Sequence, residues 1–268
     1  MVHTLKTNWK VYSMEAICLG LFMVSACFFG TLLEFPGSPI HQVLPNDFLR
    51  LCLMGAAMGV TATVIIYSPM GKLSGAHMNP AVSFTFVRLG KMKWQDGIFY
   101  SLFQCVGGVI AVYLMVWALG EGFTSKPVNY VVTAPGKLGA RVAFIVEIAI
   151  AFCMMMMVLV TSNNSRLSKY TGLFAGFFVM TYVIVSGPIS GFGMNPSRSL
   201  ASAIPAMQFT SFWIYVLAPF IGMMTAAEFY KRVSGGVLCA KMHHSTFYKC
   251  IFNCGYCEHE TQDASSKS

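Results

Sequence analysis

The chain has 268 residues, of which 56% are hydrophobic and only 10% are charged, and its mean hydropathy is +0.62. Soluble globular domains carry about 25% charged residues, so this composition excludes an ordinary soluble domain. Long uncharged runs recur along the chain, at 16–33, 51–70, 98–120, 148–164, 171–197 and 199–227. A helix needs about 20 apolar residues to cross a bilayer, so we expect a helical protein that crosses the lipid bilayer several times.

The net charge of +8 indicates the topology of the chain in the membrane and does not indicate nucleic-acid binding. If six helices cross, thirteen of the 18 Lys and Arg residues fall on one side, four fall on the other, and Arg198 lies within the membrane region. Cytoplasmic loops of membrane proteins carry the excess of Lys and Arg. We therefore expect a multi-pass protein of the plasma (inner) membrane with both termini in the cytoplasm. The first apolar run is long enough to span, so no cleavable signal peptide is expected.

In chain order, the first half contains three predicted crossings, at roughly 13–33, 47–67 and 94–119. Residues 68–72 interrupt the apolar pattern after the second crossing. A short apolar helix then begins at Asn79 and ends near Arg88. At 1.5 Å per residue it is about 15 Å long, which is half of a hydrocarbon core about 30 Å thick.

The second half repeats this plan, with predicted crossings at roughly 138–161, 170–186 and 211–231. Gly187-Pro188 is expected to break the chain, and a second short helix begins at Asn195 and ends near Pro205. Three crossings per half is an odd number, so the halves are expected to be inverted relative to each other. The expected units are a cytoplasmic N-terminus at 1–12, a first inverted repeat at 13–125, a second at 126–232, and a cytoplasmic Cys/His-rich tail at 233–268.

Two similar segments introduce the short helices: SGAHMNPA at 74–81 and SGFGMNPSR at 190–198. Asn is a preferred helix N-cap and Pro is favoured at the first helical position, so each segment predicts a loop that becomes a helix. Broken helices in matching positions of two halves indicate a site at the bilayer midplane, where irregular backbone lines a watery cavity. The expected fold is an all-α membrane protein with six transmembrane helices, two re-entrant half-helices and an inverted 3+3 repeat.

These paired motifs resemble those of the aquaporin (major intrinsic protein) family, and the resemblance covers approximately 13–231. The family signature is two Asn-Pro-Ala boxes. Here the first is Asn79-Pro80-Ala81, and the second is Asn195-Pro196-Ser197, in which the small serine departs from the family pattern. The resemblance implies an aquaporin-like fold, a homotetramer, and two glutamates, Glu15 and Glu147, that accept hydrogen bonds from the re-entrant loops.

The short helices would place two asparagine amides and the positive ends of two helix dipoles at the centre of the pore. A water molecule there would be oriented with its oxygen toward the amides, which interrupts a proton wire and repels cations. Small residues let the preceding backbone approach the lumen. The carbonyls expected to line it are those of Gly75, Ala76, His77, Gly191, Phe192 and Gly193.

The family places a narrow outer constriction at four positions, which correspond here to Met58, Val183, Phe192 and Arg198. The first position is Met58 if the loop after the second crossing holds one extra residue, and Gly59 if it does not. Strict water channels usually carry an aromatic residue and a His at the first two positions, so Met and Val make this gate more apolar. At other positions, Ser199 and Ala203 resemble the residues of water channels, whereas Phe192 and the Gly187-Pro188 step resemble those of glycerol facilitators. The expected function is therefore a passive channel for water and small neutral solutes that excludes protons and ions. A facilitator of glycerol or small polyols is the alternative.

Other classes of function find less support in the sequence. We expect no enzyme, since no nucleophile–base arrangement or cofactor-binding loop is present. A proton-coupled transporter would need a path of ionisable residues, and Glu15, Glu147 and Arg198 are too few. Nucleic acid is not an expected partner, and no cofactor is expected for permeation.

The C-terminal tail differs in composition from the rest of the chain. Within 21 residues it carries seven candidate ligands: Cys239, His243, His244, Cys250, Cys254, Cys257 and His259. Thiolate and imidazole groups at such spacing suit zinc or another soft metal. The alternatives are a reduced tail without metal and an acylated membrane anchor. A metal-sensing membrane protein is the corresponding third class of function.

Overall fold

The computed structural model describes residues 1–244 and 250–256, and within these residues it contains helices and no strand. Six of the helices are long and apolar enough to cross a membrane. They are α1 (Val2–Glu34), α3 (Asp47–Tyr67), α6 (Trp94–Leu119), α8 (Gly139–Ser162), α9 (Thr171–Ser190) and α11 (Phe212–Ser234). The expectation of an all-helical protein with six membrane-crossing helices is confirmed.

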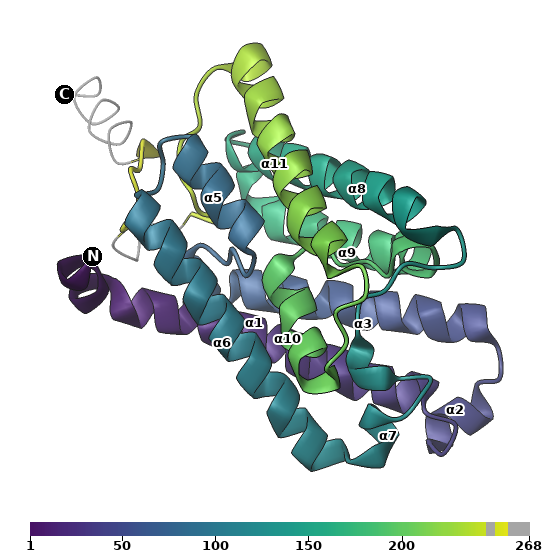
Figure 1. Cartoon of the computed structure of the whole chain (residues 1–268). Helices are drawn as coiled ribbons and strands as arrows, with labels where there is room; N and C mark the ends of the chain where they lie inside the picture. Colours follow the sequence, from purple (N-terminus) through teal and green to yellow (C-terminus); the bar gives the residue numbers. More distant parts are fainter. Residues whose placement is uncertain (245–249, 257–268) are drawn as a thin grey trace, which may run out of the picture.

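The remaining elements are short. They are α2 (Pro39–Val43), α4 (Pro69–Ser74), α5 (Pro80–Arg88), α7 (Glu121–Thr124), α10 (Pro196–Ala206) and the 3-10 turns η1 (Asn129–Val131) and η2 (Ser168–Tyr170). Figure 1 shows α5 and α10 among the long helices, with the loops that precede them meeting near the middle of the bundle. These two helices begin at Pro80 and Pro196, one residue after the predicted starts, and Asn79 and Asn195 are their N-caps, as the motifs indicated.

The long helices pack in close pairs, α1 with α6, α8 with α11, and α3 with α9. Small residues allow this approach. A Cβ atom added to Gly107 of α6 would lie 2.2 Å from the carbonyl oxygen of Ala16 in α1. Glycines at helix contacts let backbones approach closely, which is how helices associate in lipid, where the hydrophobic effect between helices is absent.

The outer faces of the bundle are apolar. On α6, Trp117 is 87% exposed, and Leu102, Val106, Ile110 and Leu114 are also exposed. Many of the buried side chains, by contrast, are polar, including two glutamates and an arginine. An apolar exterior around a partly polar interior is the arrangement of a protein whose solvent is lipid.

Two helices differ from the predicted ranges. Helix α1 begins at Val2 instead of residue 13, because residues 2–12 contain neither Pro nor Gly and continue the helix beyond the apolar run. The predicted break at Gly187-Pro188 is wrong, since α9 continues through Pro188, ends at Ser190 and is capped by Gly191. Gly191 has φ +82°, and its N–H caps the helix by donating to the Gly187 carbonyl. Helices commonly end at a left-handed residue, and glycine adopts that conformation without a Cβ penalty.

We predict that Gly107→Ala destabilises the α1–α6 pair, because the added methyl group would overlap the Ala16 carbonyl and push the helices apart. The expected loss is about 1–3 kcal/mol of unfolding free energy, measured as a lower midpoint of thermal unfolding in detergent. The matched control is Gly187→Ala in α9, where a Cβ meets nothing within 4 Å. Equal midpoints for the two variants would contradict the prediction.

Candidate functional site

The side chains of Asn79 and Asn195 cap the two short helices. The Oδ1 atom of Asn79 accepts from the backbone N–H of Ala81 at 2.9 Å. The Oδ1 atom of Asn195 accepts from Ser197 at 3.0 Å and from Arg198 at 3.3 Å. Because each Oδ1 atom faces the helix that its asparagine caps, the Nδ2 atom of the same side chain faces away from that helix.

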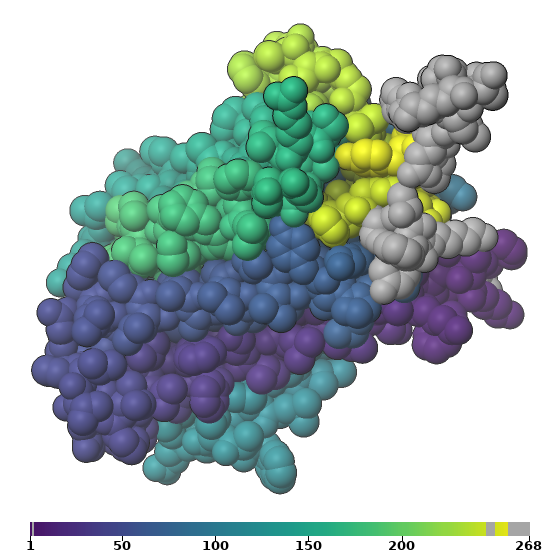
Figure 2. Space-filling view, turned by 180° about the vertical axis from the view of Figure 1, so that it is seen from behind, coloured from purple at the N-terminus to yellow at the C-terminus, as the bar shows by residue number. Residues whose placement is uncertain are grey.

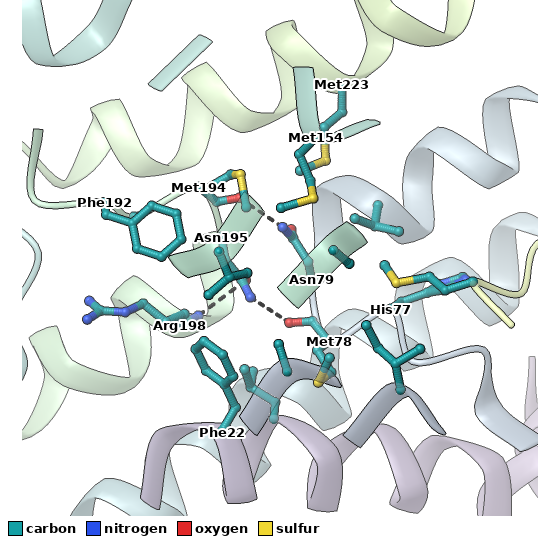
Figure 3. Close-up of a pocket in the computed structure, with 18 residues that line it drawn as sticks. Phe22, His77, Met78, Asn79, Met154, Phe192, Met194, Asn195, Arg198 and Met223 are labelled. Carbon is teal, nitrogen blue, oxygen red and sulfur yellow. Dashed lines mark hydrogen bonds between the residues drawn. The ribbon is translucent and has the colours of Figure 1, made fainter. Parts of the chain in front are cut away.

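The two amide nitrogens join the loops to each other. Asn79 Nδ2 donates to the Met194 carbonyl at 2.8 Å, and Asn195 Nδ2 donates to the Met78 carbonyl at 2.5 Å. We call this reciprocal pair the asparagine clasp (Figure 3). An amide nitrogen carries two N–H groups, so the clasp uses one from each asparagine and leaves the other able to donate to a molecule in the adjoining cavity.

Two fully buried glutamates hold the loops from behind. Glu15 accepts from the backbone N–H groups of His77 (3.0 Å) and Met78 (2.6 Å), and also from Ser74 Oγ and Gln104 Nε2. The resemblance implied this role for Glu15, and the hydrogen bonds bear it out. A buried carboxylate is costly unless its oxygens are hydrogen-bonded, and here both oxygens accept.

Glu147 makes the matching contacts in the second half. It accepts from the backbone N–H groups of Gly193 (2.9 Å) and Met194 (2.5 Å), and from Ser190 Oγ (2.6 Å). Because both oxygens are engaged by the loop, Glu147 supports the loop and offers no free path for a proton.

The loops need this support because their backbone is strained. Ala76 and Met78 have φ +54° and +49°, and Phe192 and Met194 have φ +46° and +48°. Left-handed conformations of residues other than glycine cost of order 1–3 kcal/mol each and persist only where neighbours hold them. The clasp and the glutamates supply that restraint, so the loops are rigid parts of the site.

Beside the clasp lies a cavity with a volume of ≈ 90 Å³ available to water-sized molecules. This is room for several waters, since a single water needs roughly 10–15 Å³ by this measure. Both asparagines line it, together with His77, Met78, Phe192, Gly193, Met194 and Arg198. The remaining lining is apolar: Leu19, Phe22, Ala62, Ile66, Val82, Met154, Ala175, Val179, Met223 and Met242.

Only some of the loop residues whose carbonyls were expected to line the lumen lie at this cavity. His77, Phe192 and Gly193 line the cavity, whereas Gly75, Ala76 and Gly191 do not. The Gly75 carbonyl accepts a hydrogen bond from the backbone N–H of Met242 at 3.2 Å, so it is engaged by the C-terminal tail. Its expected role as an acceptor in the lumen is not supported by this cavity and stays a prediction.

Arg198 reaches the cavity between the rings of Phe192 and Phe22 (Figure 3). Its Nη1 atom donates to Thr133 Oγ1 at 2.7 Å. Within residues 1–244 and 250–256 no carboxylate lies within 4.0 Å of the guanidinium. The positive charge therefore remains uncompensated by an ion pair at the edge of the cavity. Thr133 was not expected, and no local pattern in the sequence points to it.

The other two constriction residues, Met58 and Val183, are buried and lie outside the lining of this cavity. Each lies one helical turn from a lining residue: Met58 from Ala62 on α3, and Val183 from Val179 on α9. Residues four apart share a helix face, so both continue the lining face. Their place at the outer constriction stays a prediction.

Ser197 replaces the alanine of the second box without disturbing the clasp. It is fully buried, and its Oγ lies 3.0 Å from the sulfur of Cys105 in α6. The hydroxyl therefore has a partner away from the cavity, which explains how serine is tolerated at this position.

The tail forms part of the site, which the sequence did not predict. Met242 lines the cavity, and the Ala240 carbonyl accepts from His77 Nε2 at 2.6 Å. Since a carbonyl can only accept, His77 carries a proton on Nε2. The tail therefore covers the end of the cavity on the side where α5 leaves it.

The structure brings together four of the candidate metal ligands, Cys239, His244, Cys250 and Cys254. The prediction that His243 is a metal ligand is wrong, because its ring packs edge-on against Tyr67 and lies outside this group. Cys257 and His259 lie outside the described residues. The sulfurs of Cys239 and Cys250 are 3.6 Å apart, and the hydrogen bond between them raises the pKa of Cys239 and lowers the pKa of Cys250.

Comparison with known proteins agrees with this geometry. A family model described as Major intrinsic protein matches residues 3–230. Aquaporin NIP2-2 of Zea mays is 32% identical over 218 residues, which cover 80% of this chain and 72% of the maize protein. Aquaporin NIP1-2 of Arabidopsis thaliana is 32% identical over 207 residues, which cover 75% of this chain and 70% of that protein.

A solved structure shares the fold. The X-ray structure of the aquaglyceroporin from Plasmodium falciparum matches with a TM-score of 0.67 at 23% sequence identity, over 83% of this chain and 95% of that chain. The matching family model, the curated relatives and the two Asn-Pro boxes lead to one conclusion. This chain belongs to the major intrinsic protein family.

Proposed function

We propose that the chain is a passive membrane channel for water and small neutral solutes, and that it excludes protons and ions. The observation that carries this proposal is the asparagine clasp. It directs one amide N–H from each half toward a cavity whose other walls are mostly apolar. Such a lumen offers water a few well-placed donors and few groups that would bind it tightly.

Charge exclusion has two sources. The N-termini of α5 and α10 both face the clasp, and each carries the equivalent of about half a positive charge. Together they repel a cation about 4 Å away by about 4 kcal/mol at an effective dielectric constant of about 20, which is roughly a thousandfold in occupancy. The charge of Arg198, which has no carboxylate within 4.0 Å among the described residues, adds to this repulsion at the edge of the cavity. Proton exclusion follows because the clasp orients a central water and interrupts the hydrogen-bonded chain.

A facilitator of glycerol or small polyols remains the second candidate. The observation in its favour is the apolar character of Met58 and Val183, which lie on the lining faces of α3 and α9 one turn beyond the cavity. Apolar side chains there would accommodate the carbon backbone of a polyol while Arg198 donates to its hydroxyl groups.

We also propose that the channel is a homotetramer in the plasma (inner) membrane with both termini in the cytoplasm. The uneven distribution of Lys and Arg supports this topology. The resemblance to the family supports the tetramer. No enzymatic activity is proposed.

The test of function is an osmotic jump applied to proteoliposomes in a stopped-flow instrument. Vesicles with the protein should shrink faster in an impermeant osmolyte than empty vesicles, because the channel adds a path for water. The same vesicles in a glycerol gradient should re-swell faster than empty vesicles if the second candidate is right. Shrinkage at the rate of empty vesicles would contradict the channel.

Arg198→Val is expected to raise permeability to larger neutral solutes and to cations, because it removes the charge and widens the cavity beside Phe192. The measurement is the ratio of urea or Na⁺ flux to water flux in proteoliposomes. Arg141→Val, at an exposed position in α8, is the matched control and should keep the wild-type ratio. An unchanged ratio in Arg198→Val would refute the assignment of Arg198 to the constriction.

A further inference from the structure

The four tail ligands lie close enough together to bind a single metal ion. The ligand atoms of Cys239, His244, Cys250 and Cys254 all lie within 4.8 Å of one another. Two edges of the group are short: Cys239 Sγ to Cys250 Sγ is 3.6 Å, and Cys254 Sγ to His244 Nε2 is 3.2 Å. In a tetrahedral zinc site with Zn–S near 2.3 Å and Zn–N near 2.0 Å, these edges are about 3.8 Å and about 3.5 Å. These two distances therefore need to change by only a few tenths of an ångström to accept the ion, and every other pair of ligand atoms lies within 4.8 Å.

The surroundings suit a bound ion. The ring of His244 stacks on Tyr256 with centroids 4.5 Å apart, and the Tyr256 hydroxyl donates to the Ser162 carbonyl at 2.7 Å. This contact sets the orientation of the imidazole, as the surroundings of metal sites commonly do. Three thiolates, a neutral imidazole and Zn²⁺ carry a net charge of −1. Lys241 is 1% exposed, and its Nζ has no hydrogen-bond partner among the described residues, so its positive charge offsets that of the loaded site.

The tail is well packed although it lacks regular structure. Residues 235–244 and 250–255 contain no helix or strand, yet five of their side chains are buried hydrophobics: Val237, Cys239, Ala240, Met242 and Phe252. Hydrogen bonds attach the segment to three other parts of the protein, through Asn163, Lys91 and Gly75. Figure 2 shows the tail (yellow) seated between the first half (blue) and the second half (green) of the chain. In an irregular segment of this kind, the free energy of metal binding can help to hold the chain in one conformation.

We propose that Cys239, His244, Cys250 and Cys254 bind one Zn²⁺ ion, and that the ion fixes the tail across the end of the pore. The thiols release their protons to solvent on binding. The burial of Cys239, which is 2% exposed, argues against acylation of this thiol.

The ion is connected to the lumen through a short stretch of chain. Between the ligands Cys239 and His244 lie Ala240, whose carbonyl holds His77, and Met242, whose side chain lines the cavity. A bound ion therefore holds Met242 in the lumen, and its removal releases the segment that carries Met242. The site thus regulates permeation, and this part of the proposal rests on the proposed channel function.

Metal content tests the site directly. Full-length protein purified in detergent should retain about one zinc per chain, and replacement by Co²⁺ should give the thiolate charge-transfer and tetrahedral d–d absorption bands. His244→Ala should weaken binding by at least about tenfold, whereas the adjacent His243→Ala should bind like the wild type. Protein that binds neither zinc nor Co²⁺, or equal losses in the two histidine variants, would overturn the site. The wild-type cobalt spectrum gives this answer even if a variant fails to fold.

Flux measurements test the regulation separately. In wild-type proteoliposomes a membrane-permeant zinc chelator should raise the water flux severalfold, and added zinc should reverse the rise. Met242→Ala should keep its zinc and show a high flux that the chelator does not change. Bound zinc with a flux indifferent to the chelator would refute the regulation while leaving the metal site in place. Bound zinc with no flux above empty vesicles in any condition would instead refute the channel.

Discussion

The asparagine clasp is the interaction on which the rest of the structure depends. Asn79 and Asn195 each use an oxygen to cap their own helix and a nitrogen to hold the opposite loop. Each side chain thus fixes the start of a helix and the contact between the two halves at the same time. Removing either amide would leave helix N–H groups and a loop carbonyl unsatisfied in the interior, where each such group costs about 1–3 kcal/mol.

Around the clasp, buried backbone at membrane depth must find partners within the protein. Glu15 and Glu147 meet that requirement for the two loops with closely matching hydrogen bonds. In addition, Tyr100 donates to the Ser74 carbonyl at 2.7 Å and Tyr215 donates to the Ser190 carbonyl at 2.6 Å. The correspondence explains why carboxylates are retained in an apolar interior. Neither carboxylate forms an ion pair with the described part of the chain. Both instead accept hydrogen bonds from the N–H groups of strained loops, which allows the lumen to keep a fixed shape.

The pore and the tail form one unit. His77 belongs to the first loop through its N–H bond to Glu15, lines the cavity, and binds the tail through Ala240. A change in the tail is therefore transmitted to the lumen over a few covalent and hydrogen bonds. Through this direct contact the proposed metal site would act on permeation without any rearrangement of the transmembrane helices.

The sequence by itself determined the six crossings, the two short helices and their caps, because hydropathy and capping are local properties of successive residues. It also identified both clasp asparagines and both glutamates through the repeated motif and the family resemblance. Only the tertiary structure decided that α9 continues past Pro188, that Thr133 holds Arg198, and that Met242 reaches the lumen. It likewise distinguished His244 from its neighbour His243, which the sequence treated alike. These features depend on contacts between residues far apart in the chain, and the path of the backbone, not composition or spacing, brings them together.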